Sequence, residues 1–334
     1  MSVAALSPSY VAARNRAGLI ARNPGLIVVS GRDRASYLQG LLTNDVVALT
    51  PGQGCYAAYL TAQGRMISDL RVYELGDAML LVLPRATKDT VLAKLDQFIF
   101  SEDVQLGDLS ETFASLAVVG PDAAGLLSHI FGADAANLDA WLLHGNRRFV
   151  LEGQPVIVVR SSDMGEPGFE LVASLVQVGA LSSALRARGA VDVDDHTAEA
   201  LRIEGGVPLF GRDMDEETIP LEAGIEDRAI SFTKGCYVGQ EVIIRVLHRG
   251  HGRVARRLVG LTLEPQHDVP PPGTTLHAED KVVGAVTSSA WSPALGRPIA
   301  LGYVKRDLAQ VDVMVRTAGA VDARVVALPF VSRS

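Results

Sequence analysis

Residues 233–241, which read Thr-Lys-Gly-Cys-Tyr-Val-Gly-Gln-Glu, lie where the pattern of the 334-residue chain changes. Before this stretch, strand-like and helix-like segments alternate with long connections. After it, from about residue 250, nearly every apolar segment is strand-like. Alternating helices and strands pack in layers, whereas a run of short strands closes into a barrel or sandwich. The stretch therefore separates two regions of different architecture.

The N-terminal region, residues 1–249, is predicted to be α+β. Short aliphatic or β-branched runs bounded by glycine, proline or charged residues indicate strands at 25–30, 79–83, 115–119 and 156–160. Apolar residues at helical spacing, with turn signals at their ends, predict helices at 9–20, 87–100, 122–131 and 176–188. In the first of these helices, the arginines are expected to face solvent. The mixture predicts sheets covered by helices.

The C-terminal region, residues 250–334, is predicted to be a small β-barrel. A hard turn, Pro-Pro-Pro-Gly, occupies residues 270–273. Strand-like segments then follow one another at 281–287, 299–305, 311–316 and 323–328. Several short strands at this spacing are typical of a barrel or sandwich.

Composition excludes several classes of protein. Hydrophobic residues make up 48% of the chain and charged residues 21%, which supports real cores and excludes a disordered chain. No apolar run approaches the roughly 18–20 residues that a membrane span needs. The formal net charge of −7 argues against generic nucleic-acid binding, because neutralising phosphates needs a basic surface. We therefore expect no membrane and no nucleic acid among its partners.

Cysteine content points to a reducing compartment. Cys55 and Cys236 are too few for a disulfide framework or for an iron–sulfur site built by the protein alone. The N-terminus lacks the pattern of a secretion signal, so we expect a cytoplasmic protein. An organelle transit peptide is the alternative, because four arginines precede the first acidic residue, Asp33.

The thiol of Cys236 is predicted to be reactive. Gly235 and Gly239 allow a tight, exposed turn around it, and Lys234 would share its face in an extended segment. A helix is predicted to begin at Gln240. A thiol beside a cation and near a helix N-terminus is favoured as the thiolate. The alternative is a small buried cysteine, which is how we interpret Cys55.

The segment after this cysteine is basic, from Arg245 to Arg257. His248 and His251 lack the paired spacing of a metal site, so we predict no metal. A patch for an anionic partner and a merely solvated surface both remain open.

The motif around Cys236 resembles the signature of YgfZ-type folate-binding proteins. These are relatives of the glycine-cleavage T-protein, an aminomethyltransferase, and they include the mitochondrial late-acting iron–sulfur assembly factor. The resemblance extends along most of the chain. Further blocks that resemble the family lie in family order at 37–46, 60–70, 165–170, 201–206 and 286–296.

The resemblance implies α+β subdomains, partly ferredoxin-like, around a folate channel, followed by a C-terminal β-barrel. It implies tetrahydrofolate, or a one-carbon derivative, as the ligand. By similarity, Glu170 accepts hydrogen bonds from the pterin ring, whose ring N–H and amino group suit a carboxylate. Arg202 and Arg245 supply charge for the carboxylates of the folate tail. Asn44 and Tyr237 belong to the same family blocks and are candidate folate contacts.

One departure from the T-protein pattern concerns the proton-transferring carboxylate. T-proteins carry paired aspartates before the leucine that corresponds to Leu70, and the first is the catalytic candidate. Here that position is Ser68, and only Asp69 is retained. A serine cannot hold a proton as a carboxylate does near neutral pH. This comparison argues against aminomethyl transfer.

The sequence therefore predicts a tetrahydrofolate-binding accessory protein that supports assembly or repair of iron–sulfur enzymes through transient contacts. Cys236 would be its key thiol, with Lys234, Gln240 and Asp69 in the reactive site. The alternative is a folate-dependent aminomethyltransferase or methyltransferase in which Asp69 replaces the missing carboxylate. A third reading, a folate-sensing or RNA-associated module, would use the basic stretch at 245–257.

Overall fold

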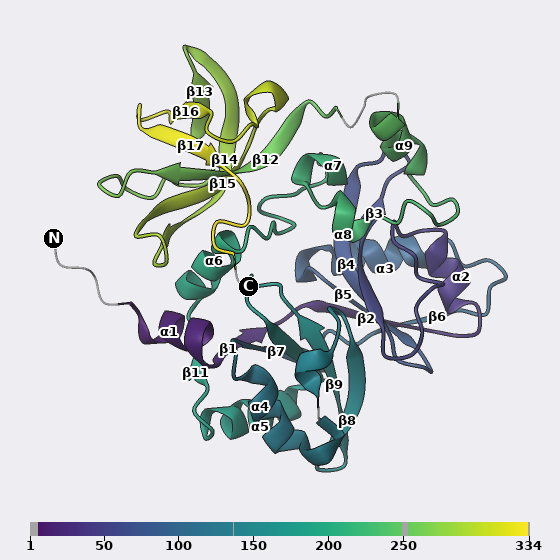
Figure 1. Ribbon diagram of the computed structural model, residues 1–334. Coiled ribbons are helices and arrows are strands. Elements are labelled where there is room, and N and C mark those ends of the chain that lie inside the picture. The colour runs from purple at the N-terminus through teal and green to yellow at the C-terminus, as the bar shows by residue number, and fades with distance from the viewer. Residues whose placement is uncertain (1–5, 136, 249–252, 333–334) are drawn as a thin grey trace.

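The chain folds into two β-sheets that face each other and a separate barrel, as the computed structural model shows (Figure 1). The structure describes residues 6–135, 137–248 and 253–332. The barrel lies at the upper left of Figure 1, one sheet at the right and the other at the bottom. The α+β class and the C-terminal barrel predicted from the sequence are confirmed.

The first sheet has the antiparallel strand order β3-β4-β5-β2-β6. Its strands are β3 (Gly54–Leu60), β4 (Met66–Glu74), β5 (Met79–Leu83), β2 (Gly25–Ser30) and β6 (Gln105–Asp108). Helices α2 (Arg34–Gln39) and α3 (Lys88–Asp96) cover one face, where Leu38, Val91 and Leu95 pack onto the sheet. The other face is turned toward the second sheet.

The second sheet has the order β11-β1-β7-β10-β9-β8. Its strands are β11 (Val191–Asp192), β1 (Gly18–Arg22), β7 (Phe113–Val119), β10 (Gly168–Ser174), β9 (Gln154–Ser161) and β8 (Asn146–Leu151). Helices α4 (Ala123–Phe131) and α5 (Leu175–Arg186) cover its outer face. Where the two sheets meet, Tyr73 and Val82 of the first pack with Val159 and Val172 of the second.

The C-terminal strands close into a barrel in the order β12-β15-β14-β13-β16-β17. They are β12 (Arg256–Leu263), β13 (Thr275–Ala278), β14 (Lys281–Ser292), β15 (Arg297–Lys305), β16 (Met314–Thr317) and β17 (Asp322–Val326). Their apolar residues fill the interior, among them Leu261, Val286 and Val325. The predicted domain boundary after residue 249 falls in 249–252, outside the described residues.

Helix α6 (Asp195–Glu204) connects the barrel to the rest of the molecule through two buried charged side chains. Arg202 donates to Glu199 twice, to Asp213, to the Val207 carbonyl and to Ser288 of the barrel, at 2.5–2.9 Å. These five bonds use all five N–H groups of a guanidinium. Two residues later, Glu204 accepts from Tyr10 and Arg14, which lie near the N-terminus, and from Ser292 of β14.

Two of the predicted helices are shorter than the sequence pattern indicated. The helix predicted at 9–20 is α1 (Pro8–Asn15), because strand β1 begins at Gly18. Gly18 packs so closely that an added Cβ would come within 2.5 Å of Val193. Arg14, which we expected to face solvent, is instead buried against Glu166 and Glu204. The helix predicted at 87–100 ends at Asp96.

Among the described residues, no helix has the length and apolar character that crossing a membrane requires.

The buried position of Arg202 leads to a stability prediction. Arg202→Met removes one partner from a buried ionic network and leaves Asp213, whose side chain is fully buried, without its cation. We expect a loss of about 3–5 kcal/mol in unfolding free energy, measured by urea denaturation. The control is Arg316→Ala, which removes an exposed ion pair with Asp322 and should cost about 0–1 kcal/mol. Equal losses in the two variants would contradict this role of Arg202.

Candidate functional site

Strand β4 places charged side chains in the space between the two sheets. Because side chains alternate along a strand, Asp69, Arg71 and Tyr73 share one face. Tyr73 packs against the second sheet, which identifies this face as the inner one. Ser68 lies on the opposite side, where its hydroxyl is 2.7 Å from the Thr87 hydroxyl. The position that the T-protein comparison assigned to the lost carboxylate therefore does not face the space between the sheets, whereas Asp69 does.

A cavity of about 490 Å³ lies on this inner side, between β4, the β10 side of the second sheet and α6. Three residues predicted from the sequence, Asp69, Glu170 and Arg202, line this one cavity. They come from three different elements and are about 30 to 130 residues apart in the chain. We take this cavity as the candidate site.

Asp69 is a buried carboxylate in which one oxygen accepts a hydrogen bond and the other has no partner among the described residues. Its Oδ2 accepts from the Tyr56 hydroxyl at 2.8 Å. Its Oδ1 is buried and has no hydrogen-bond partner among the described residues. Burial raises the pKa of Asp69, while the charge of Arg71 and the Tyr56 hydrogen bond act against the rise. Such a carboxyl is suited to hold a proton nearer neutral pH than an ordinary aspartate.

Glu170 lies across the cavity on β10 and is 2% exposed. Its Oε1 accepts from the Ser115 hydroxyl at 2.6 Å, and the Arg22 guanidinium is 3.9 Å away. The carboxylate is therefore positioned by neighbouring strands. It can still accept hydrogen bonds from a ligand, because an ionised carboxylate offers about four acceptor sites.

An ion pair between Arg71 and Asp163 links the two sheets beside the cavity, with a nitrogen–oxygen distance of 2.8 Å. Asp163 lies in the connection between β9 and β10, and Arg22 is 3.7 Å from the same carboxylate oxygen. Burial alone would raise the pKa of Asp163, but Arg71 and Arg22 outweigh it and hold that pKa below its ordinary value. Asp163 therefore stays ionised at neutral pH.

Arg202 lines the cavity, but its guanidinium is hydrogen-bonded entirely to other groups of the protein. All its N–H groups bond to the acceptors described above, so none is left for a ligand carboxylate. Near the same cavity, Arg212 pairs with Glu199 at 3.0 Å and is 57% exposed. Its exposed guanidinium can contact an anionic ligand group.

The residues of the cysteine motif lie elsewhere. The Lys234 ammonium donates to three backbone carbonyls, those of Gln39, Leu42 and Asn44, at 2.7–2.8 Å. Burial lowers the pKa of Lys234 to about 8, yet three carbonyl acceptors match the three donors of the charged form. Lys234 therefore holds the segment after α2 in place and does not offer its ammonium to the thiol.

Cys236 itself is exposed and does not line this cavity. Tyr237 is buried in an apolar cluster, and Gln240 begins α9 (Gln240–His248), as predicted. The proposed reactivity of Cys236 stays a prediction.

Two other predicted contacts lie outside the cavity. Asn44 donates to the backbone carbonyls of Tyr56 and Arg228, at 2.8 and 3.0 Å. Arg245 is exposed on α9. In the basic stretch that follows, Arg256 and Arg257 pair with Glu222 and Glu226. Residues 249–252 of that stretch lie outside the described residues.

Within the described ranges, no group of three or more His, Cys, Asp or Glu side chains is arranged to hold a metal ion.

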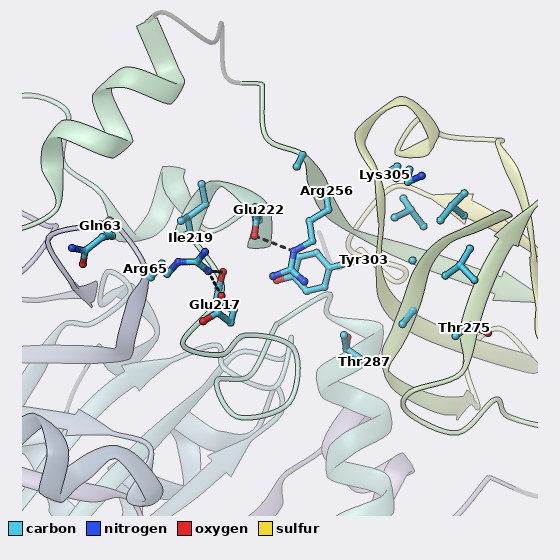
Figure 2. Close-up of a pocket in the computed structure, with 16 residues that line it drawn as sticks. Gln63, Arg65, Glu217, Ile219, Glu222, Arg256, Thr275, Thr287, Tyr303 and Lys305 are labelled. Atoms are coloured by element: carbon cyan, nitrogen blue, oxygen red, sulfur yellow. Dashed lines mark hydrogen bonds and ion pairs between the residues drawn. The ribbon is translucent and has the colours of Figure 1, made fainter.

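A larger cavity of about 900 Å³ lies between the barrel, α7 (Pro220–Ala223) and the turn after β3 (Figure 2). Figure 2 shows Arg65 beside Glu217, and Arg256 beside Glu222 and over Tyr303. The two carboxylates that line this larger cavity, Glu217 and Glu222, are thus already paired with arginines. In the part of the chain that the structure describes, no residue predicted for the site lines it. The smaller cavity is the better candidate for a ligand site, because it contains the buried Oδ1 of Asp69, which has no hydrogen-bond partner among the described residues.

Five polar residues near Asp69 and Glu170 were not predicted from the sequence: Tyr56, Arg71, Tyr73, His144 and Asp163. A signal existed for β4, where Asp69, Arg71 and Tyr73 alternate with Leu70 and Val72. No sequence signal pointed to His144 or Asp163, because tertiary packing brings them to the site.

Comparison with known proteins agrees with this geometry. Residues 4–234 match the family model "GCVT N-terminal domain", and residues 256–332 match "Glycine cleavage T-protein C-terminal barrel domain". Two curated relatives carry the name aminomethyltransferase. The chain is 34% identical to the one from Rubrobacter xylanophilus, covering 99% of this chain and 87% of the relative. It is 35% identical to the one from Streptomyces coelicolor, covering 97% and 89%.

A solved structure is also similar. It is the glycine cleavage system aminomethyltransferase T from Bartonella henselae, with a TM-score of 0.87 and 25% identity. The similarity covers 97% of this chain and 88% of that one. The T-protein-like fold expected from the sequence is therefore confirmed.

These relatives correct the function expected from the sequence. The iron–sulfur accessory function is wrong, because the nearly full-length relatives are named aminomethyltransferases. The relatives support the T-protein family and do not confirm the narrower YgfZ-type assignment. Ser68 does not count against aminomethyl transfer, because its side chain lies on the outer face of β4 while that of Asp69 lines the cavity. By its domain matches, its relatives and its fold, this chain belongs to the glycine-cleavage T-protein family.

Proposed function

We propose that this protein transfers a one-carbon unit from an aminomethyl donor to tetrahydrofolate. The observation that carries the proposal is the buried carboxylate of Asp69, which lines the cavity and has one oxygen without a protein partner. The name of the relatives, aminomethyltransferase, supports the reaction class.

The proposed reaction moves a methylene carbon from an amine to two nitrogens of the folate. Two folate N–H protons are lost as the two new carbon–nitrogen bonds form. One proton leaves with the amine as ammonia, and the other goes to the donor atom that had held the carbon. A carboxylate beside the reacting nitrogens can accept a proton from one of them and pass it on. Asp69 supplies that group, and the Tyr56 hydroxyl fixes its orientation.

Glu170 is the proposed partner of the pterin ring. A pterin presents a ring N–H and an amino group side by side, and a carboxylate accepts both at once. Glu170 is buried on the opposite wall of the cavity from Asp69, so the ring would lie between them. A cavity of about 490 Å³ is within the range of small-molecule sites. The carboxylates of the folate tail would meet Arg212, since the N–H groups of Arg202 are occupied.

Asp69→Asn tests the role of the carboxylate. Asparagine keeps the shape but cannot accept the proton, so we expect formation of methylene-tetrahydrofolate to fall about 10²–10⁴-fold. The measurement uses tetrahydrofolate and an aminomethyl-loaded carrier protein. Ser68→Ala is the matched control on the other face of β4 and should retain activity. Loss of activity in Ser68→Ala, with activity retained in Asp69→Asn, would contradict the proposal.

Glu170→Gln tests the ligand and the choice of cavity. Removing the charge weakens two charge-assisted hydrogen bonds, so we expect the Kd for tetrahydrofolate to rise about 10–100-fold by calorimetry. Glu222→Gln changes a carboxylate in the larger cavity and should leave that Kd unchanged. The reverse pattern would place the folate in the larger cavity.

A further inference from the structure

Around the candidate site, four buried side-chain atoms have no hydrogen-bond partner within the described residues. They are Asp69 Oδ1, Arg71 Nε, the Tyr73 hydroxyl and His144 Nδ1. Folded proteins pair the large majority of their buried polar atoms with protein or water. A cluster of unpaired atoms therefore marks a place where a polar molecule belongs.

The four atoms belong to one neighbourhood with Arg71 at its centre. Asp69, Arg71 and Tyr73 occupy successive inward positions of β4. The charge of Arg71 acts on the pKa of Asp69, of Tyr73 and of His144. The rings of Tyr73 and His144 lie 6.3 Å apart between their centroids. Asp69 and Arg71 also line the candidate cavity, so the neighbourhood borders it.

His144 is held in this neighbourhood by an unusual backbone conformation. It has φ of 67°, in the left-handed region, although it is not glycine. Its N–H donates to the Arg160 carbonyl at 3.0 Å, which fixes the segment just before β8. Gly54 makes room for it, because an added Cβ there would come within 2.9 Å of the His144 carbonyl. A left-handed non-glycine residue costs of order 1–3 kcal/mol and persists where the surroundings impose it, often at functional sites.

His144 is uncharged at neutral pH. Burial lowers its pKa to about 4, and the cations of Arg71 and Arg228 act in the same direction, against Asp163. A neutral imidazole has one ring nitrogen that donates and one that accepts. It therefore offers a ligand a hydrogen bond without adding another positive charge beside Arg71.

We propose that His144 is a further ligand-contacting residue of the candidate site, whose Nδ1 hydrogen-bonds the reduced pterin ring beside Arg71 and Tyr73. The inference rests on the proposed function and adds a residue to its site. Arg71 Nε can donate a hydrogen bond and Asp69 Oδ1 can accept one. The Tyr73 hydroxyl and His144 Nδ1 can each donate or accept. This set matches a ligand edge on which a carbonyl oxygen lies next to a ring N–H. A tetrahydropterin presents such an edge.

The test observes the imidazole directly in the intact wild-type protein. The chain has 7 histidines, so ¹⁵N-histidine labelling gives a small set of ring signals, and His144→Asn identifies those of His144. We expect the Nδ1 signal of His144 to shift when tetrahydrofolate is added. His144→Asn tolerates the left-handed backbone and keeps a polar atom near Nδ1, so it should bind within about threefold of wild type. His144→Phe should raise the Kd about tenfold or more, with its folding checked by thermal unfolding.

The outcomes separate this inference from the proposed function. One outcome would overturn the inference alone: wild type binds tetrahydrofolate, but the His144 signals do not move and a folded His144→Phe variant binds equally well. In that case His144 does not contact the ligand, and water pairs with its Nδ1. The proposed function would then stand and the inference would fall. If wild type does not bind tetrahydrofolate, or Glu170→Gln binds it as tightly as wild type does, the proposed function falls and the inference falls with it.

Discussion

The ion pair between Arg71 and Asp163 is the interaction on which the candidate site depends. It joins β4 of the first sheet to the β9–β10 connection of the second, at 2.8 Å, where the two sheets face each other. Two largely buried charges are expensive to desolvate and persist only when they compensate each other. Their presence keeps the space between the sheets polar, so that Asp69 and Glu170 can line a cavity instead of an apolar core.

Helix α6 supplies the second constraint, because it fixes the barrel against the two sheets. Arg202 and Glu204, two residues apart, reach Ser288 and Ser292 of β14. Asp213, the partner of Arg202, also accepts from Thr287 of the same strand. The smaller cavity lies on the sheet side of this junction, and Thr287 lines the larger cavity on the barrel side. The candidate site is therefore assembled from segments far apart in sequence, with helix α6 on one side of it.

The sequence predicted the parts of the fold that are apolar and missed those that carry function. Strands β2, β5, β7 and β9 were recognisable as aliphatic runs. Strands β4 and β10 were not predicted as strands, since the inward positions of Asp69, Arg71 and Glu170 interrupt the apolar pattern; only parts of them fall within the family blocks at 60–70 and 165–170. Buried charges of this kind are stabilised by partners on other elements, which a local pattern does not show.

The cysteine motif shows the same limit. Lys234 and Cys236 share a face only if the segment is extended, and the structure has no strand at 231–239 in the described chain. The lysine instead turns inward to three carbonyls, and the thiol remains exposed. The structure brings Asp69, Glu170 and Arg202 to one cavity, and it also shows that every N–H group of Arg202 already has an acceptor in the protein.

The most direct test of the account is a crystal structure of this protein with tetrahydrofolate. The account predicts the pterin ring between the two sheets, with Glu170 on its amino and ring N–H edge and the reacting nitrogens within hydrogen-bond reach of Asp69. Folate bound in the larger cavity between α7 and the barrel, away from Asp69, would contradict it.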